Sequence, residues 1–321
     1  MKKLRMMISA IALLLLLPVN AQASEQLIPV GRIVGLQLRN HTVTIAAFDD
    51  TMGSWAQNAG LRIGDEIVQA GEREIHSPED LKNALRDCNG TLPLTIRRGS
   101  RKVAVKLHPE KTRDGYRLGV FLRQGIAGIG TVTFLNPETG VFGALGHGVN
   151  EPGGCLLQMT GGTIYSAEVL SVRRGKSGNP GQLKGTADPA HPCGELYRNS
   201  PRGVFGITEE RWQGTPVETA EREELHTGNA QIRTTVNGAE PRDYSAEILK
   251  IYPEGRENGR DLLLKITDPE LLAATGGIVQ GMSGSPILQD GKLIGAVTHV
   301  LIGEPSVGYG IFIGNMLEAA G

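Results

Sequence analysis

The chain has 321 residues, and its 33 Lys and Arg against 34 Asp and Glu give a formal net charge of −1. This length accommodates two domains and a sizeable hydrophobic core. The balanced charge gives no support to a nucleic-acid partner. Three cysteines, Cys88, Cys155 and Cys193, are too few and too odd in number for a disulfide framework.

The first 23 residues have the pattern of a secretory signal. Three basic residues precede an apolar run over residues 8–19, and Ala21-Gln22-Ala23 follows it. We expect cleavage after Ala23, because small residues at this spacing mark the signal-peptidase site. The alternative is an uncleaved N-terminal anchor, since residues 13–17 are strongly apolar. Either way, the body of the protein is expected to work outside the cytoplasm.

The cysteines and histidines leave two minor alternatives open. Cys155 and Cys193 could pair in an oxidising compartment. His147, Cys155, His191 and Cys193 are chemically suitable zinc ligands. Their spacing matches no compact zinc-binding pattern, so the sequence predicts neither a metal site nor a cofactor.

Residues 24–118 have the pattern of a small domain built from strands and helices. Two strands are expected at 33–38 and 42–48, split by a turn at 39–41. Residues 54–67, Ser-Trp-Ala-Gln-Asn-Ala-Gly-Leu-Arg-Ile-Gly-Asp-Glu-Ile, resemble the PDZ signature Ser-Pro-Ala-x-x-Ala-Gly-Leu-x-x-Gly-Asp-x-Ile. A helix follows, with Ser77 as its N-cap, an apolar face from Leu81 to Cys88 and an end near Asn89-Gly90. Strands at 92–97 and 102–107 complete the domain.

The resemblance also implies a peptide-binding site. PDZ domains add an extended peptide beside a strand and a helix, with its chain end near a glycine loop. Val34, Gly35 and Leu36 match that loop position. The alternative is that this domain binds no external ligand and only orients the second domain.

A hairpin in residues 119–321 leads to a candidate catalytic base. Strands at 131–135 and 141–145 flank an Asn-Pro-Glu-Thr-Gly turn and end in Gly146-His147-Gly148. Neutral imidazole has the right pKa to take a seryl proton near pH 7. A histidine in such a turn is where trypsin-like peptidases keep their base. His299 also has a strand setting, but we expect it to be a hydrogen-bonded structural residue.

A glycine-flanked serine supplies the candidate nucleophile. Residues 281–286 read Gly-Met-Ser-Gly-Ser-Pro, which resembles the Gly-Asp-Ser-Gly-Gly-Pro motif of trypsin-like serine peptidases. Ser283 is the nucleophile candidate, and the N–H groups of Gly281 and Ser283 form a candidate oxyanion hole. An Asp-Gly hairpin and a buried strand follow, as in the second barrel of those enzymes. The alternative is a structural turn without chemistry. Met282 departs from the motif, so activation by pairing an acidic residue with a freed N-terminus is excluded.

The third member of a triad is less clear from the residues. Asp268 ends an apolar strand before Ser283, but Asp-Pro before Glu-Leu-Leu is also a good helix start, so Asp268 could be an N-cap instead. Asp188 and Asp243 are weaker choices.

Taken together, these motifs resemble the stage IV sporulation protein B peptidases, the SpoIVB type, over residues 28–317. The most specific stretches are Gly-Ile-Val-Gln-Gly-Met-Ser-Gly-Ser-Pro-Ile and Gly-Ala-Val-Thr-His-Val. The resemblance implies a mainly β protein, a PDZ domain followed by a trypsin-like antiparallel double β-barrel, with His147, Asp268 and Ser283 as the triad. It also implies an enzyme secreted across the inner forespore membrane, which cuts itself and a membrane-bound regulator of an intramembrane protease.

Two other functions fit the same motifs. One is a secreted PDZ peptide-binding protein whose barrel has lost catalysis, although serine, histidine and aspartate occur in the right order. The other is a general envelope quality-control protease, although such enzymes place the peptidase domain before the PDZ domain.

Overall fold

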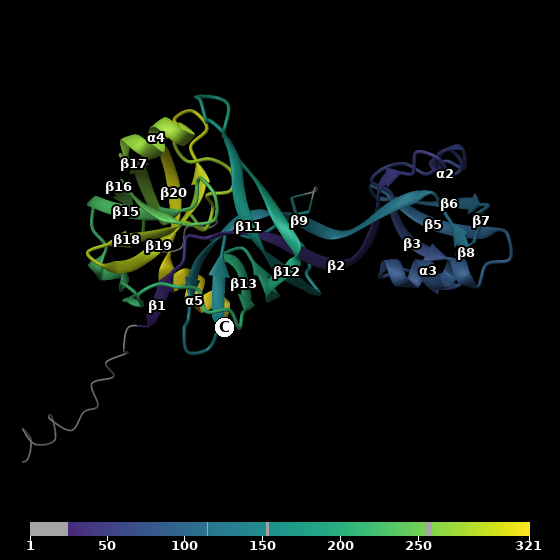
Figure 1. Cartoon of the computed structure of the whole chain (residues 1–321), viewed down its shortest axis with the longest axis horizontal. Coiled ribbons are helices and arrows are strands. Elements are labelled where there is room, and N and C mark those ends of the chain that lie inside the picture. Colours follow the sequence, from purple (N-terminus) through teal and green to yellow (C-terminus); the bar gives the residue numbers. More distant parts are fainter. Residues whose placement is uncertain (1–24, 114, 152–153, 254–258) are drawn as a thin grey trace, which may run out of the picture.

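The computed structural model describes residues 25–113, 115–151, 154–253 and 259–321. Figure 1 shows a mainly β protein in which a large lobe and a small lobe are joined by two long strands. The predicted signal segment, residues 1–23, lies outside the described residues. Among the helices that the structure describes, none is long and apolar enough to cross a membrane.

The large lobe begins with a closed six-stranded antiparallel barrel. Its ring runs β9–β10–β13–β12–β11–β2, and β2 pairs back onto β9. Alternating apolar residues point inward, and Phe142, Ile164 and Val204 are fully buried in its core. The strands are β2 (Ile33–Phe48), β9 (Val120–Leu135), β10 (Val141–Ala144), β11 (Gly161–Arg173), β12 (Gln182–Ser200) and β13 (Gly203–Ile207), with β1 (Gln26–Pro29) and β14 (Val217–Glu218) added at the β9 edge.

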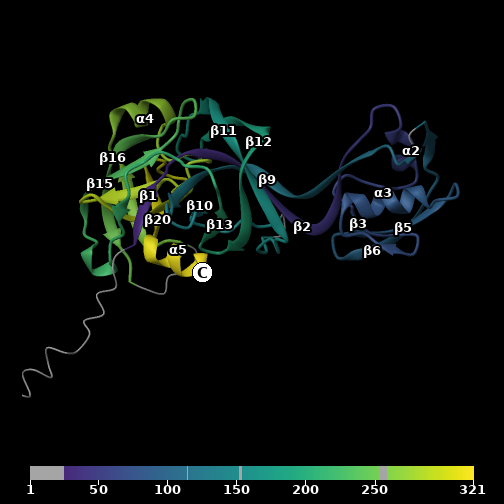
Figure 2. The ribbon, with the colours of Figure 1, turned by 60° about the horizontal axis from the view of Figure 1, so that its bottom comes forward.

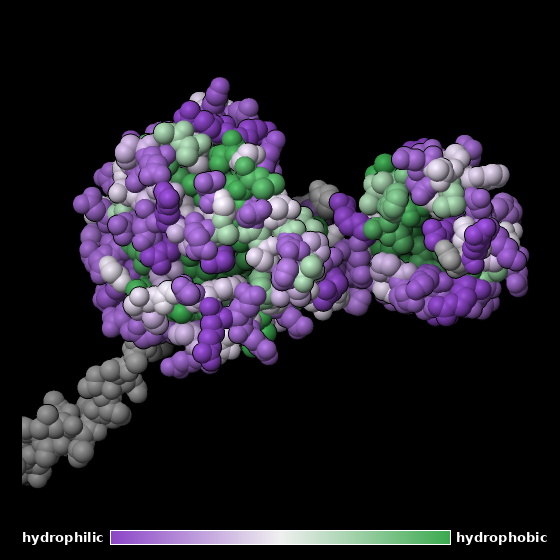
Figure 3. Space-filling model, viewed as in Figure 1, coloured by the Kyte–Doolittle hydropathy of each residue, from purple (hydrophilic) through white to green (hydrophobic). Residues whose placement is uncertain are grey.

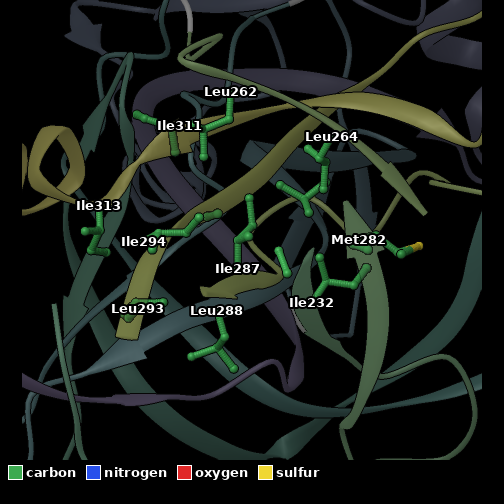
Figure 4. Packing of buried hydrophobic residues seen from close by; sticks show 14 of the residues in the cluster. Ile232, Leu262, Leu264, Met282, Ile287, Leu288, Leu293, Ile294, Ile311 and Ile313 are labelled. Atoms are coloured by element: carbon green, nitrogen blue, oxygen red, sulfur yellow. The ribbon is translucent and has the colours of Figure 1, made fainter. Parts of the chain in front are cut away.

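A second closed barrel completes the large lobe. Its strands follow the order β15–β16–β17–β20–β19–β18. Figure 4 shows Ile232, Leu264 and Ile287 among the apolar side chains that fill it. These elements are β15 (Gly228–Thr234), β16 (Arg242–Ile251), β17 (Leu262–Ile266), α4 (Pro269–Thr275), β18 (Pro286–Gln289), β19 (Lys292–Val300), β20 (Val307–Phe312) and α5 (Ile313–Ala320), preceded by the short 3-10 helix η1 (Arg222–Glu224). The predicted mainly β, double-barrel fold is therefore confirmed.

The small lobe has a core of its own. Leu81 of its longer helix packs against Ile67 and Ile96 of the sheet. The predicted cap is present, because the Ser77 side chain accepts a hydrogen bond from the Asp80 N–H. Its elements are α2 (Gly53–Asn58), β3 (Glu66–Ala70), β4 (Arg73–Glu74), α3 (Pro78–Arg86), β5 (Leu92–Arg98), β6 (Arg101–Leu107), β7 (Glu110–Thr112) and β8 (Gly115–Arg117).

The connection between the lobes corrects the expected domain boundary. Residues 33–39 of β2 pair with β9 and β11 inside the first barrel, whereas residues 43–48 pair with β9 and β3 in the small lobe. The expected turn at 39–41 is absent, and a register irregularity between Leu38 and Val43 takes its place. The small lobe is thus inserted between two strands of the barrel (Figure 2). A boundary at residue 118 is wrong for residues 26–39, because β1 pairs with β9 at the edge of the barrel and residues 33–39 of β2 complete its ring.

Candidate active site

Strand β9 of the first barrel holds the serine turn of the second. The Thr131 N–H donates to the Ser283 carbonyl at 3.1 Å, and the Thr131 hydroxyl donates to the Gly281 carbonyl at 2.8 Å. The Thr133 hydroxyl donates to the Gly284 carbonyl at 2.8 Å. Gly284 has φ +95°, and a Cβ there would lie 2.1 Å from the Thr131 carbonyl oxygen. The glycine after the serine is therefore required both by its conformation and by the close approach of β9.

Met282, the departure from the trypsin-like motif, is a core residue. Its side chain is fully buried among the apolar residues of the second barrel (Figure 4). An acidic side chain at this position would be buried in an apolar environment, which is costly without a partner. Packing thus explains the methionine.

Three N–H groups of the serine turn are hydrogen-bonded and two are not, among the described residues. Those of Met282, Gly284 and Ser285 donate to backbone carbonyls within the turn or on β19. Among the described residues, no acceptor is present for the N–H groups of Gly281 and Ser283. These are the two groups that the sequence predicts as an oxyanion hole, and the turn leaves both of them available.

The Ser283 hydroxyl donates to the Thr298 carbonyl of β19 at 2.9 Å. Thr298 is the extra residue of a β-bulge, since Val297 pairs with Gly310 and His299 pairs with the next residue back, Tyr309. Bulges often re-aim side chains beside active sites. Here the bulge turns the Thr298 carbonyl toward the serine.

His147 enters the site from the turn that follows β10. Leu145 and Gly146 both have positive φ, +69° and +68°, and a Cβ on Gly146 would lie 2.9 Å from the Thr298 side chain. The His147 Nδ1 lies 2.9 Å from the Gly148 carbonyl oxygen. Because a carbonyl only accepts, Nδ1 carries the proton and neutral Nε2 carries the lone pair. Burial lowers the pKa of His147 below 6.5, so the imidazole is neutral at pH 7.

A second imidazole, that of His299, lies beside the first. The ring centroids of His147 and His299 are 5.3 Å apart, with 41° between the ring planes. The His299 Nδ1 is buried and has no hydrogen-bond partner among the described residues. Burial, with the nearby His147 and Arg260, lowers the pKa of His299 to about 4. The expectation of a hydrogen-bonded structural histidine is therefore wrong for this nitrogen.

Asp268 does not reach this group. Its carboxylate caps α4, where it accepts from the N–H groups of Glu270 and Leu271 at 3.0 Å, and it also accepts from the Ser245 N–H at 3.3 Å. Within the described residues, no hydrogen bond or ion pair joins a carboxylate to His147 or His299. The helix-cap interpretation thus accounts for Asp268, and the resemblance-based role beside His147 finds no contact to support it.

The weaker aspartate candidates have other partners. Asp188 pairs with His191 on exposed β12, and Asp243 pairs with Arg233. The cysteines Cys88, Cys155 and Cys193 are unpaired. Among the described residues, no three His, Cys, Asp or Glu side chains cluster as metal ligands.

The residues that the sequence predicts as a peptide-binding loop do not lie in the small lobe. Val34, Gly35 and Leu36 lie in the barrel part of β2, where Gly35 pairs with Tyr165 of β11 and a Cβ on Gly35 would lie 2.4 Å from the Ala187 side chain. They cannot line a groove of the small lobe. In that lobe, residues 120–124 of β9 pair with β2 along one edge only, among the pairings described. The Gln124 amide on this segment donates to the His76 carbonyl at 2.9 Å, just before α3.

Comparisons with protein families and with solved structures both give matches. A profile of the SpoIVB peptidase S55 family matches residues 114–317. No curated protein matches the chain. Among solved structures, the inactive form of the Rv3671c protease is 14% identical with a TM-score of 0.37, and the alignment covers 60% of this chain and 84% of that one. An inactive serine-to-alanine variant of Rv3671c from M. tuberculosis is 13% identical, with the same TM-score and coverage of 61% and 82%.

Proposed function

The chain belongs to the SpoIVB peptidase S55 family and is a serine peptidase, and we propose that it is an exported endopeptidase with Ser283 as nucleophile and His147 as general base. The observations that carry the proposal are the hydrogen bond from Ser283 to the Thr298 carbonyl and the ring contact of His147 with His299, the residue next to Thr298 on β19. Serine and histidine come from different barrels, as a nucleophile and base across a cleft require.

The steps of the proposed reaction follow from the atoms present. The Ser283 hydroxyl breaks its hydrogen bond to the Thr298 carbonyl, and its oxygen attacks the carbonyl carbon of the peptide. The hydroxyl proton passes at the same time to the His147 Nε2. The oxyanion is stabilised by the Gly281 and Ser283 N–H groups. When the C–N bond breaks, His147 gives its proton to the leaving amine. A water then hydrolyses the acyl-enzyme by the same proton transfers in reverse. The Gly148 carbonyl keeps the His147 proton on Nδ1 throughout.

The proposal is tested by labelling the mature chain, residues 24–321, with a fluorophosphonate. We expect one adduct, at Ser283 by mass spectrometry, and none in a folded Ser283→Ala variant. A folded wild-type protein that takes no label and shows no self-cleavage would favour the peptide-binding alternative.

We further propose that the small lobe is a PDZ domain that binds an extended chain end. Its support is the signature at residues 54–67, the single-edge pairing of β9 at 120–124 and the neighbouring helix α3. A peptide would then add to β9 rather than near Val34. Figure 3 shows apolar surface on the side of the small lobe that faces the large lobe, which an incoming peptide could use. A Val120→Pro change removes a backbone donor from this segment. We expect it to weaken the binding of peptides that were first selected for binding to the purified wild-type chain. Unchanged affinity for those peptides would contradict the assignment.

The physiological role is proposed from the family resemblance. The enzyme would be exported, cut itself, and cut a membrane-bound regulator of an intramembrane protease during sporulation. Its test is the fate of such a regulator when incubated with the wild-type chain and with Ser283→Ala. Cleavage by the wild-type chain alone supports the role, and equal degradation of generic unfolded proteins would favour a quality-control protease.

A further inference from the structure

A glycine of the segment before β17 packs into the candidate active site. The Thr298 hydroxyl donates to the Gly259 carbonyl at 2.7 Å. Gly259 has φ +61°, and a Cβ there would lie 3.0 Å from the Gly146 carbonyl oxygen. The same glycine thus contacts both the bulge of β19 and the turn that carries His147. This close fit sets the place where the next residue, Arg260, leaves the segment.

The guanidinium of Arg260 lies on the outer face of the second barrel, close to the two imidazoles. Arg260 is exposed, and its guanidinium lies 5.2 Å from the centroid of the Tyr309 ring. Tyr309 pairs directly with His299, so their side chains share one face of the sheet. The His299 ring in turn lies 5.3 Å from that of His147. A row of side chains thus leads outward from the candidate base: His147, His299, Tyr309 and Arg260.

Within the described residues, no carboxylate forms an ion pair with Arg260. Asp261, its chain neighbour, is buried, and its carboxylate accepts from the Phe312 N–H at 2.9 Å and from the Asn315 amide at 2.8 Å. Burial, His147 and the charge of Arg260 all lower the pKa of His299, so both imidazoles are neutral at pH 7 and add no cation to the row. Arg260 is therefore the cation of this row that an anionic group of a substrate would meet.

The backbone beside the serine offers a substrate the edge of a strand. β18 pairs with β19 only as far as Ala296, so residues 298–300 pair on one side only, with β20, among the pairings described. An extended peptide can add to this edge, antiparallel to β19 as β18 is. The residue whose carbonyl is attacked then lies beside Thr298, because the Thr298 carbonyl holds the Ser283 hydroxyl. The residue before it lies beside His299, and by alternation the second and fourth residues before the scissile bond share the face of His299.

We propose that Arg260, held over the Tyr309 ring, is a specificity-determining residue that selects substrates with Asp or Glu at the second or fourth residue before the scissile bond. The inference rests on the proposed function and names the class of substrate for that site. A carboxylate at either position gains a charge-assisted hydrogen bond to the guanidinium. Because Arg260 is exposed, the gain is moderate and decreases with salt.

The test digests a synthetic peptide library with the mature chain and identifies the cut bonds by mass spectrometry, with Ser283→Ala as the blank. The wild-type chain is compared with Arg260→Gln and Arg260→Glu. Lys250→Glu is the matched control, because the Lys250 ammonium also lies over a tyrosine ring, 4.9 Å from the centroid of Tyr252. The preference is then measured as the ratio of kcat/KM for two peptides that differ only by Glu or Gln at the favoured position.

We expect the wild-type chain to favour the Glu peptide by about fivefold in low salt, and by less in high salt. Arg260→Gln should lose the preference, Arg260→Glu should reverse it, and Lys250→Glu should keep it. A library without acidic preference at either position would overturn the inference. So would a preference that persists in Arg260→Glu, or one that Lys250→Glu loses equally.

A binding measurement separates this inference from the proposed function. If the folded wild-type chain takes no fluorophosphonate label and cuts no peptide, the proposed function fails. The same library is then selected by binding to Ser283→Ala and to the double variant Ser283→Ala with Arg260→Glu. Acidic peptides retained by the first protein and not by the second support the inference, and identical selections overturn it.

Discussion

The two halves of the candidate site are held in different ways. The serine turn is fixed by three hydrogen bonds from Thr131 and Thr133 of the opposite barrel, and by a buried methionine beneath it. The imidazole of His147 has one backbone hydrogen bond, to its own neighbour Gly148, and a ring contact with His299. The serine turn is therefore held by hydrogen bonds from the opposite barrel, whereas the imidazole of the base is held by one hydrogen bond within its own segment and by its contact with His299. Changes to the first half should alter folding and activity together, and changes to the second half should alter mainly activity and its pH dependence.

The largest effect is expected from Gly284→Ala. The added Cβ would lie 2.1 Å from the Thr131 carbonyl oxygen and would also require φ +95°, so the turn or β9 must move. We expect a loss of more than about 3 kcal/mol in the free energy of unfolding and no labelling of Ser283.

Gly291→Ala is the matched control for that change. Gly291 has φ +80° in the Asp-Gly hairpin, but nothing lies within 4 Å of its Cβ position. This variant should lose about 1 kcal/mol in urea unfolding and keep its labelling rate. Similar losses in both glycine variants would show that conformation alone, and not the approach of β9, explains Gly284.

The buried imidazoles should make stability depend on pH. The pKa of His299 is about 4 in the folded chain against 6.5 in an unfolded one, so between these values only the unfolded chain binds the proton. The free energy of unfolding should therefore fall as the pH drops from 6.5 to 4. Because the ring is partly exposed, we expect about 2 kcal/mol from this residue rather than the full value of the shift.

His299→Phe provides the check on that dependence. It should flatten the decline over the same pH range, measured by urea unfolding at several pH values. An equally steep decline in His299→Phe would show that other groups cause it.

A smaller effect should separate the two threonines of β9. Thr131→Val removes the hydroxyl that donates to the Gly281 carbonyl, and Thr133→Val removes the one that donates to the Gly284 carbonyl. Each should cost about 1 to 2 kcal/mol of stability, because a buried carbonyl loses its donor. Only Thr131→Val should also slow labelling by about tenfold, since Gly281 supplies an oxyanion donor. Equal rates in the two variants would argue against that donor.

Local patterns in the sequence predicted the elements around the site well. The Ser77 cap, the hairpin before His147 and the Asp-Gly hairpin after Ser283 each depend on neighbouring residues, and all three are present. Asp268 also shows that local patterns were the better guide. The helix-cap interpretation, which depends on neighbouring residues, describes its contacts, and the distant pairing with His147 is absent among the described residues.

Pairing between distant strands could not be predicted in the same way. Residues 33–38 and 42–48 are rich in strand-forming residues whether they form a hairpin or one long strand, and only their pairing with β9 decides between the two. The position of Val34 to Leu36 in the barrel follows from that pairing. The bulge at Thr298 likewise arises from register with β20, so alternation along β19 could not give the direction of His299.

The smallest effect on stability, and the sharpest test, concerns Asp268. Asp268→Ala should lose about 1 kcal/mol through its missing cap. Asp268→Ser should keep the cap, because serine is a good N-cap residue, while it removes the carboxylate. The two variants therefore separate capping from catalysis.

The role of Asp268 is measured by the rate at which a fluorophosphonate labels Ser283 in Asp268→Ser, with Ser283→Ala as the blank. If the carboxylate of Asp268 serves as the cap of α4 and the Gly148 carbonyl holds the tautomer of His147, Asp268→Ser should label within about threefold of the wild-type rate. A folded Asp268→Ser protein that labels no faster than the blank would contradict a cap role alone and would place Asp268 in the triad with His147 and Ser283.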